Sequence, residues 1–176
     1  MHLVLIRHTR VDVPPGTCYG QTDVPLAATF RQEADGVARR LQAFGAFDAV
    51  FSSPLSRARR LAAHCGHPTP QLDNRLMEMS MGDWEMRRFD DIDDPYLQQW
   101  YAHYMDLPTP HGESFPQLYA RVASFLDELK SQPYRNVAVF AHGGVLLCAG
   151  IHAHLYAADE AWDHQVEYGG MIEIEN

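Results

Sequence analysis

Three short apolar runs constrain the fold of this chain more than any other feature of its sequence. They cover residues 2–6, 48–51 and 136–141, and runs of this length without polar alternation are typical of β-strands buried on both faces. Between them, apolar residues recur at helical spacing over residues 30–41 and again over 115–129. Strands and helices therefore alternate along the chain.

This alternation predicts an α/β fold, namely a three-layer α/β/α sandwich with a mainly parallel central sheet and helices on both faces. A chain of 176 residues, of which 46% are hydrophobic, is large enough to bury one core and is ordinary for a single globular domain. The sequence contains no visible internal repeat. We therefore expect one domain.

Three local signals predict where further helices begin. The Ser53-Pro54 pair predicts a helix directly after it, with serine as the N-cap and proline in the first turn. Ser114 followed by Gln117 predicts a capping box ahead of the later helix. Pro95 predicts the start of a helix that runs to about residue 104.

The charge balance narrows the classes of partner. The chain has 14 Lys and Arg against 23 Asp and Glu, a formal net charge of −9, so its surface should repel nucleic acid and anionic lipid. We expect no nucleic acid and no membrane partner. Because Arg7 interrupts the first apolar run, that run is too short for a signal peptide or a membrane-spanning helix, and we expect a cytoplasmic location.

Residues that can bind a phosphate or attack phosphorus follow all three predicted strands. Arg7 and His8 follow the first, Arg57 lies shortly after the second, and His142 and Gly143 follow the third. Ligands of parallel sheets bind at the carboxyl ends of the strands. Arginine binds phosphate through two parallel hydrogen bonds, a neutral imidazole can attack phosphorus, and glycine lets backbone N–H groups approach an anion. Each residue alone is usually structural, but together they indicate an anion site.

Several motifs then appear in a specific order. They are Arg7-His8, the segment SSPLSRARR from Ser52, Glu78 followed by GDWE at 82–85, GES at 112–114 and AHGG at 141–144. This series resembles the histidine phosphatases, the phosphoglycerate mutase-like superfamily, over most of the chain. The resemblance implies a single histidine phosphatase domain over residues 1–176 with a phosphoglycerate mutase-like fold, and a substrate lid around residues 86–112.

The resemblance also implies roles for individual residues. His8 becomes the nucleophile that forms a phosphohistidine, Arg7, Arg57 and His142 bind the phosphoryl oxygens, and Glu78 becomes the proton donor. These roles agree with the chemistry, since phosphoryl transfer has a loose transition state whose negative charge is stabilised by cations and aligned donors. Glu78 must carry a proton when it assists the leaving alkoxide.

The chain departs from the family pattern directly after the nucleophile. The family usually has glycine after the histidine and a hydroxyl residue two positions further on, whereas this chain has Thr9, Arg10 and Val11. Threonine restricts a turn that glycine leaves free, and valine donates no hydrogen bond. Arg10 is a candidate for added positive charge at the phosphate. The departure leaves open a hypothesis of another class, a phosphate-binding regulatory module without catalysis.

Within the family, the segment CYGQTDVPL at residues 18–26 looks like that of α-ribazole phosphatases, which act on the lower ligand of cobalamin. Gln21 and Thr22 of this segment are candidate donors to the phosphate. The resemblance implies α-ribazole 5′-phosphate as the small-molecule substrate. A broad-specificity phosphatase and a phosphoglycerate mutase stay as alternatives, although mutases are longer, and a homodimer stays open.

Aromatic residues surround the predicted lid, and they can either stack on an aromatic base or pack in the core. They are Trp84, Trp100, Tyr101, Tyr104 and Phe115. The histidines of the chain raise a separate hypothesis of a metal site. Neither His64, Cys65 and His67 nor His152 and His154 have the spacing of a zinc site, so we expect no metal and no other cofactor.

Overall fold

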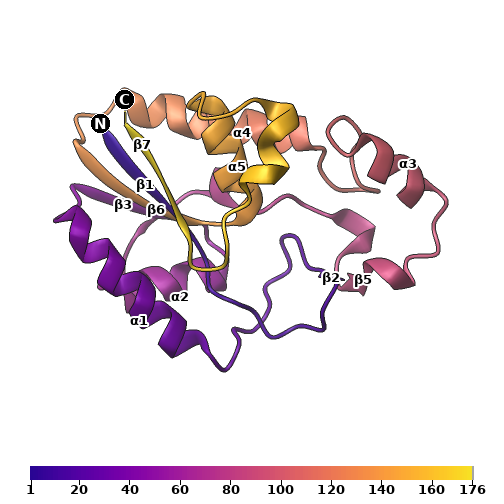
Figure 1. Cartoon of the computed structure of the whole chain (residues 1–176), viewed down its shortest axis with the longest axis horizontal. Helices are drawn as coiled ribbons and strands as arrows, with labels where there is room; N and C mark the ends of the chain where they lie inside the picture. Colours follow the sequence, from indigo (N-terminus) through magenta and orange to yellow (C-terminus); the bar gives the residue numbers. More distant parts are fainter. Residues whose placement is uncertain (176) are drawn as a thin grey trace.

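The computed structural model describes residues 1–175 and has three layers around one five-stranded sheet (Figure 1). The strand order is β4-β3-β6-β1-β7, and neighbours pair in parallel except for β1 and β7, which are antiparallel. The strands are β1 (His2–Arg7), β3 (Ala49–Ser52), β4 (Gln71–Leu72), β6 (Asn136–Ala141) and β7 (Met171–Glu175). The predicted α/β/α sandwich with a mainly parallel sheet is confirmed.

Helices cover both faces of the sheet because the strands are apolar on both. Leu3 and Leu5 of β1 pack on one side with α4 (Phe115–Lys130) and α5 (Gly143–His152). Val4 and Ile6, which point the other way, pack with α1 and α2. The bounds of these two helices are α1 (Phe30–Leu41) and α2 (Ser56–His64).

A smaller part of the chain lies beside the sandwich (Figure 1). It contains a two-stranded sheet of β2 (Thr17–Cys18) and β5 (Arg87–Arg88), and α3 (Tyr96–His103). A separate apolar cluster that includes the buried Trp84 and Leu97 stabilises it. The 3-10 turns are η1 (Gln42–Phe44), η2 (Asn74–Leu76), η3 (Gly82–Trp84), η4 (Phe89–Asp91) and η5 (Ala158–His164). The segment 86–112 thus flanks the carboxyl ends of the strands.

The predicted helix starts have different outcomes. The capping box is confirmed, since Gln117 N donates to Ser114 Oγ and Ser114 N donates to Gln117 Oε1. Pro95 directly precedes α3, as expected. The prediction that Ser53 is an N-cap is wrong, because α2 begins at Ser56 after Leu55. The Ser53 hydroxyl instead forms a hydrogen bond with His142, which directly follows β6.

The strand order brings the three predicted strand ends together. β6 lies between β3 and β1, with Ser52 beside Phe140 and Arg7 beside Ala141. The residues that follow these three strands therefore meet at one edge of the sheet. Within residues 1–175, no helix combines the length and the apolar composition that crossing a bilayer requires.

Candidate active site

His8 directly follows β1 and has a fixed tautomer. Its Nδ1 lies 2.7 Å from the carbonyl oxygen of Thr9, and because a carbonyl only accepts, Nδ1 carries the hydrogen. Burial, and secondly the charge of Arg57, lower the pKa of His8 from 6.5 to about 3. Nε2 forms no hydrogen bond within residues 1–175 and is not sealed from solvent. His8 therefore presents an unprotonated, accessible nitrogen.

His142 follows β6, and its ring meets the ring of His8 edge-on with 5.2 Å between centroids. Its Nε2 lies 2.8 Å from Ser53 Oγ. Among residues 1–175, Ser53 Oγ has no other hydrogen-bond acceptor than this nitrogen, so its hydrogen goes to Nε2 and the ring proton of His142 is on Nδ1. Burial, followed by the charge of Arg57, holds the pKa of His142 well below its ordinary value. The ring is therefore a neutral donor.

Arg57 lies in the first turn of α2 and is fully buried. Its guanidinium donates to the carbonyl oxygens of Thr22 at 2.9 Å and Gly20 at 2.6 Å. Burial lowers the pKa of Arg57, and the negative charge of Glu78 is the largest opposing influence. The arginine thus ties the loop after β2 to the site.

Arg7 is the last residue of β1 and directly precedes His8. It donates to the carbonyl oxygen of Val166 at 2.5 Å and lies 4.1 Å over the ring of Tyr168. A Cβ on Gly143 would stand 3.3 Å from the guanidinium, so the glycine allows the start of α5 to approach Arg7 closely.

Four buried polar atoms around His8 lack a hydrogen-bond partner. They are Arg7 Nε, Arg57 Nε, His142 Nδ1 and Thr9 Oγ1, and within residues 1–175 only one other buried side-chain atom, Trp100 Nε1, shares this property. Buried polar groups are nearly always hydrogen-bonded. A ligand with several acceptor oxygens, such as a phosphoryl group, would supply partners for these donors.

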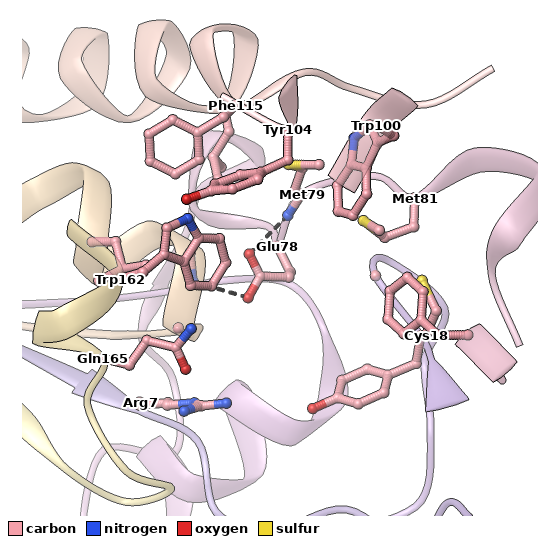
Figure 2. A pocket seen from close by; sticks show the side chains of 17 residues that line it. Arg7, Cys18, Glu78, Met79, Met81, Trp100, Tyr104, Phe115, Trp162 and Gln165 are labelled. Atoms are coloured by element: carbon pink, nitrogen blue, oxygen red, sulfur yellow. Dashed lines mark hydrogen bonds between the residues drawn. The ribbon is translucent and has the colours of Figure 1, made fainter. Parts of the chain in front are cut away.

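Glu78 stands in the middle of the pocket, between Arg7 and a group of aromatic side chains (Figure 2). Its two carboxylate oxygens accept from the backbone N–H groups of Met79 at 2.9 Å and Gly144 at 3.1 Å. A Cβ on Gly144 would stand 2.4 Å from Glu78 Oε1. Only glycine at this position allows the carboxylate to reach the start of α5.

The pocket beside these groups has a volume of about 250 Å³ and mostly apolar walls. Its aromatic wall contains Trp100, Tyr104, Phe115 and Trp162 (Figure 2). Tyr104 and Trp162 meet edge-on at 5.4 Å, which joins η5 to the segment after α3. Of the aromatic residues singled out in the sequence, Trp100, Tyr104 and Phe115 therefore line the pocket. Trp84 is instead buried in an apolar cluster, and Tyr101 is exposed and lies outside the pocket walls.

Gln21 and Thr22 are engaged within the protein. Gln21 Nε2 donates to the carbonyl oxygen of Glu78 at 2.9 Å, and Thr22 Oγ1 donates its only hydrogen to Glu85 at 2.5 Å. Glu85 also accepts from the backbone N–H groups of Gln21, Thr22 and Met81. The loop is therefore held as one unit, and the hydroxyl of Thr22 is already used.

Arg10 is absent from the walls of the main pocket, as far as residues 1–175 show, and lines a neighbouring hollow together with Arg7. Its side chain is exposed, with Nε 3.9 Å from Glu33, and its backbone N–H donates to the same carboxylate. Thr9 is buried and does not have a positive φ, so the turn after His8 does not require glycine. Val11 forms an isolated antiparallel bridge with Leu26.

Sequence reasoning missed several residues of the site. Glu85 lies in a motif that was recognised, but no role was assigned to it. Tyr19 and Tyr168 form a hydrogen bond between their hydroxyls at 3.0 Å, across 149 positions of the chain. Trp162 and Gln165 line the pocket. Trp162, Gln165 and Tyr168 lie in a segment without a motif, so the sequence offers no signal for them.

The histidines considered for metal binding have other partners. His64 pairs with Asp35 at 2.7 Å and His152 with Asp127 at 3.0 Å. Across residues 1–175, no three His, Cys, Asp or Glu side chains form a group that could hold a metal ion.

Known proteins share both the sequence pattern and the fold. The sequence model of the "Histidine phosphatase superfamily (branch 1)" matches residues 3–176. The adenosylcobalamin/α-ribazole phosphatase of Escherichia coli is 31% identical over 96% of this chain and 87% of its own. A protein of Hydrogenobacter thermophilus with the provisional name phosphoserine phosphatase 2 is 30% identical over 98% and 88%. The structure of the α-ribazole phosphatase from Shigella flexneri matches with a TM-score of 0.90 at 28% identity, over 99% of this chain and 90% of that one.

Proposed function

The chain belongs to the histidine phosphatase superfamily, branch 1, and we propose that it hydrolyses a small phosphomonoester through a phosphohistidine formed on His8. The observation that carries this proposal is the set of unpaired donors of Arg7, Arg57 and His142 around the free Nε2 of His8. A nucleophile and a cradle for phosphoryl oxygens are the two parts that this reaction needs.

In the first step, Nε2 of His8 bonds to phosphorus while the ester P–O bond breaks. The charge on the equatorial oxygens is stabilised by the two guanidiniums and by Nδ1–H of His142. Glu78 transfers its proton to the leaving alkoxide oxygen. Because the Thr9 carbonyl holds the hydrogen of His8 on Nδ1, the nucleophilic nitrogen needs no base to deprotonate it.

In the second step, the carboxylate of Glu78 takes a proton from water, and the water oxygen attacks phosphorus as the P–N bond to His8 breaks. This step releases inorganic phosphate and restores the neutral imidazole. The same carboxyl group thus serves as acid and then as base, and the Gly144 and Met79 N–H groups orient it for both steps.

We further propose α-ribazole 5′-phosphate as the substrate. The aromatic wall of Trp100, Phe115 and Trp162 suits a flat apolar heterocycle. The carboxylate of a phosphoglycerate or phosphoserine needs a cationic partner. Within the part of the chain that the structure describes, the only cationic side chain in the pocket wall is Arg7, and the proposal already assigns Arg7 to the phosphate. The similarity to the α-ribazole phosphatases of Escherichia coli and Shigella flexneri supports the same substrate.

The chemistry is tested by mixing the enzyme with ³²P-labelled p-nitrophenyl phosphate in EDTA, stopping the reaction with alkali and measuring the phosphate that is bound to the protein. We expect turnover and a phosphoprotein whose label is stable in alkali and lost in acid, and loss of both in His8→Asn. Phosphate-ligand binding without turnover in the wild-type protein would instead support a regulatory module.

The substrate is tested by comparing kcat/KM for α-ribazole 5′-phosphate, 3-phosphoglycerate, phosphoserine and sugar phosphates. We expect a preference for the first of at least about a hundredfold, which equals about 2.7 kcal/mol of transition-state discrimination. In Trp162→Ala this preference should shrink while the rates on sugar phosphates stay the same. Equal slow rates on all esters would rule out the cobalamin substrate and leave the phosphatase chemistry intact.

A further inference from the structure

Arg121 of α4 uses every hydrogen-bond donor that its guanidinium has. Nε and Nη2 form a two-pronged ion pair with Glu113, each at 2.8 Å. The remaining N–H groups donate to three backbone carbonyl oxygens, those of Arg75 at 2.7 Å, Met77 at 2.6 Å and Glu78 at 2.9 Å. A guanidinium has five N–H donors in a rigid fork, so all five are engaged.

The three carbonyls belong to the short segment that carries Glu78. Glu113, the partner of Arg121, also accepts from the backbone N–H of Ser80 at 2.8 Å. The ion pair therefore holds this segment on both sides of the candidate proton donor. Arg121 itself is absent from the walls of the pocket, as far as residues 1–175 show, so it acts on the substrate only through Glu78.

The segment receives one further bond from the loop after β2. Gln21 Nε2 donates to the same carbonyl oxygen of Glu78 that Arg121 contacts. With its backbone held in this way, Glu78 reaches Gly144 N on α5 at 3.1 Å. A shift of the backbone by a fraction of an ångström would lengthen this bond and move the carboxyl group away from the leaving oxygen.

We propose that the Arg121–Glu113 ion pair is a positioning device for proton transfer by Glu78. This inference rests on the proposed function, because it assigns a purpose to the acid of that reaction. Arg121 is a positioning residue and makes no contact with the substrate. Its loss should slow phosphohistidine formation from esters with poor leaving groups more than from esters whose leaving groups need no proton.

Two esters of similar shape separate these effects. Phenyl phosphate has a basic leaving group that needs a proton, whereas p-nitrophenolate leaves without one. Arg121→Lys keeps a cation beside Glu113. For this variant we expect kcat/KM for phenyl phosphate to fall by about tenfold or more, because a displaced general acid loses only part of its rate enhancement. The value for p-nitrophenyl phosphate should stay within about threefold. Equal losses on both esters would overturn the proposal.

A double-mutant cycle and a matched arginine provide the controls. In a Glu78→Gln background, Arg121→Lys should cause no further loss on phenyl phosphate, because the group that it positions is gone. Arg75→Lys changes an arginine that also pairs with two carboxylates, Asp73 and Glu128, yet its side chain has no contact with Glu78. It should leave the ratio of the two ester rates unchanged.

A readout without turnover keeps this inference separate from the proposed function. The amide proton of Gly144 donates to Glu78, so its NMR shift reports the position of the carboxyl group. We expect Arg121→Lys to move this resonance upfield and Arg75→Lys to leave it in place. An unshifted Gly144 amide overturns the positioning role. If the wild-type protein hydrolyses neither ester while the amide still shifts, the proposed function fails and the positioning of Glu78 stands.

Discussion

The two histidines of the site have the same side chain and opposite roles. His8 bonds a backbone carbonyl through Nδ1, which leaves Nε2 as a bare acceptor. His142 bonds Ser53 through Nε2, which leaves Nδ1 as the donor. The hydrogen-bond partner of one ring nitrogen thus decides what the other can do, and one residue type supplies both the proposed nucleophile and a proposed hydrogen-bond donor to the phosphoryl group.

A first prediction concerns the protonation of His8. Because burial and the Arg57 charge lower its pKa to about 3, the ring should remain the neutral Nδ1–H tautomer at pH 5 in the phosphate-free protein. Ring ¹⁵N shifts from pH 8 to 5 measure this directly. An imidazole that titrates near 6.5, its unperturbed pKa, would contradict the environment described for it.

At the scale of elements, the start of α5 contacts both Arg7, beside the proposed nucleophile, and Glu78, the proposed acid. Gly143 approaches Arg7, and Gly144 both donates to Glu78 and leaves room for it. A side chain on Gly144 would also stand 3.0 Å from Leu118 of α4. The short distance between α4 and α5 therefore depends on this glycine.

A second prediction follows for Gly144→Ala. Alanine favours a helix by about 1 kcal/mol over glycine, but its Cβ would stand 2.4 Å from Glu78 Oε1. We expect the carboxyl group to move and kcat/KM for phenyl phosphate to fall by about tenfold or more, with a smaller loss on p-nitrophenyl phosphate. Unchanged rates on both esters would show that Glu78 tolerates displacement.

Gly36 of α1 is the matched control for this change. A Cβ there would meet only Arg39 Nη2, at 3.9 Å, so nothing opposes the helix preference of alanine. Gly36→Ala should raise the free energy of unfolding by roughly 0.5–1 kcal/mol and leave both ester rates the same. Urea denaturation measures the first effect.

At the scale of the whole molecule, buried neutral histidines link the site to global stability. The pKa of His8 is lower in the folded chain, about 3, than its unperturbed value of 6.5. Between these values the unfolded chain binds more protons than the folded one, so the free energy of unfolding rises with pH in this window. Stability is therefore lost as the pH falls below 6.5.

The third prediction gives this loss a size. From pH 7 to pH 5 one such histidine should lower the free energy of unfolding by about 2 kcal/mol. In His8→Asn, the decrease in the free energy of unfolding between pH 7 and pH 5, measured by urea denaturation, should be smaller by this amount. In His103→Asn, which changes an exposed histidine, the decrease should equal that of the wild type. Parallel curves for wild type and His8→Asn would argue against the neutral buried state.

The sequence by itself determined the layers and the order of the chemistry. Short continuous apolar runs favour strands buried on both faces, as in β1 and β6, and amphipathic spacing favours helices such as α1 and α4. Because parallel strands end at one edge, chain order alone indicated that His8, Arg57 and His142 lie near each other. These signals are local, so they can be recognised without coordinates.

Only the tertiary structure decided how the side chains are used. Thr22 and Gln21 serve Glu85 and Glu78 within the loop, and Arg10 lies beside Glu33. The antiparallel β7, the Trp162 wall and the Arg121 contacts join parts of the chain far apart in sequence. A hydrogen bond between distant residues leaves no periodic or local trace, because its partner is chosen by packing rather than by neighbouring sequence.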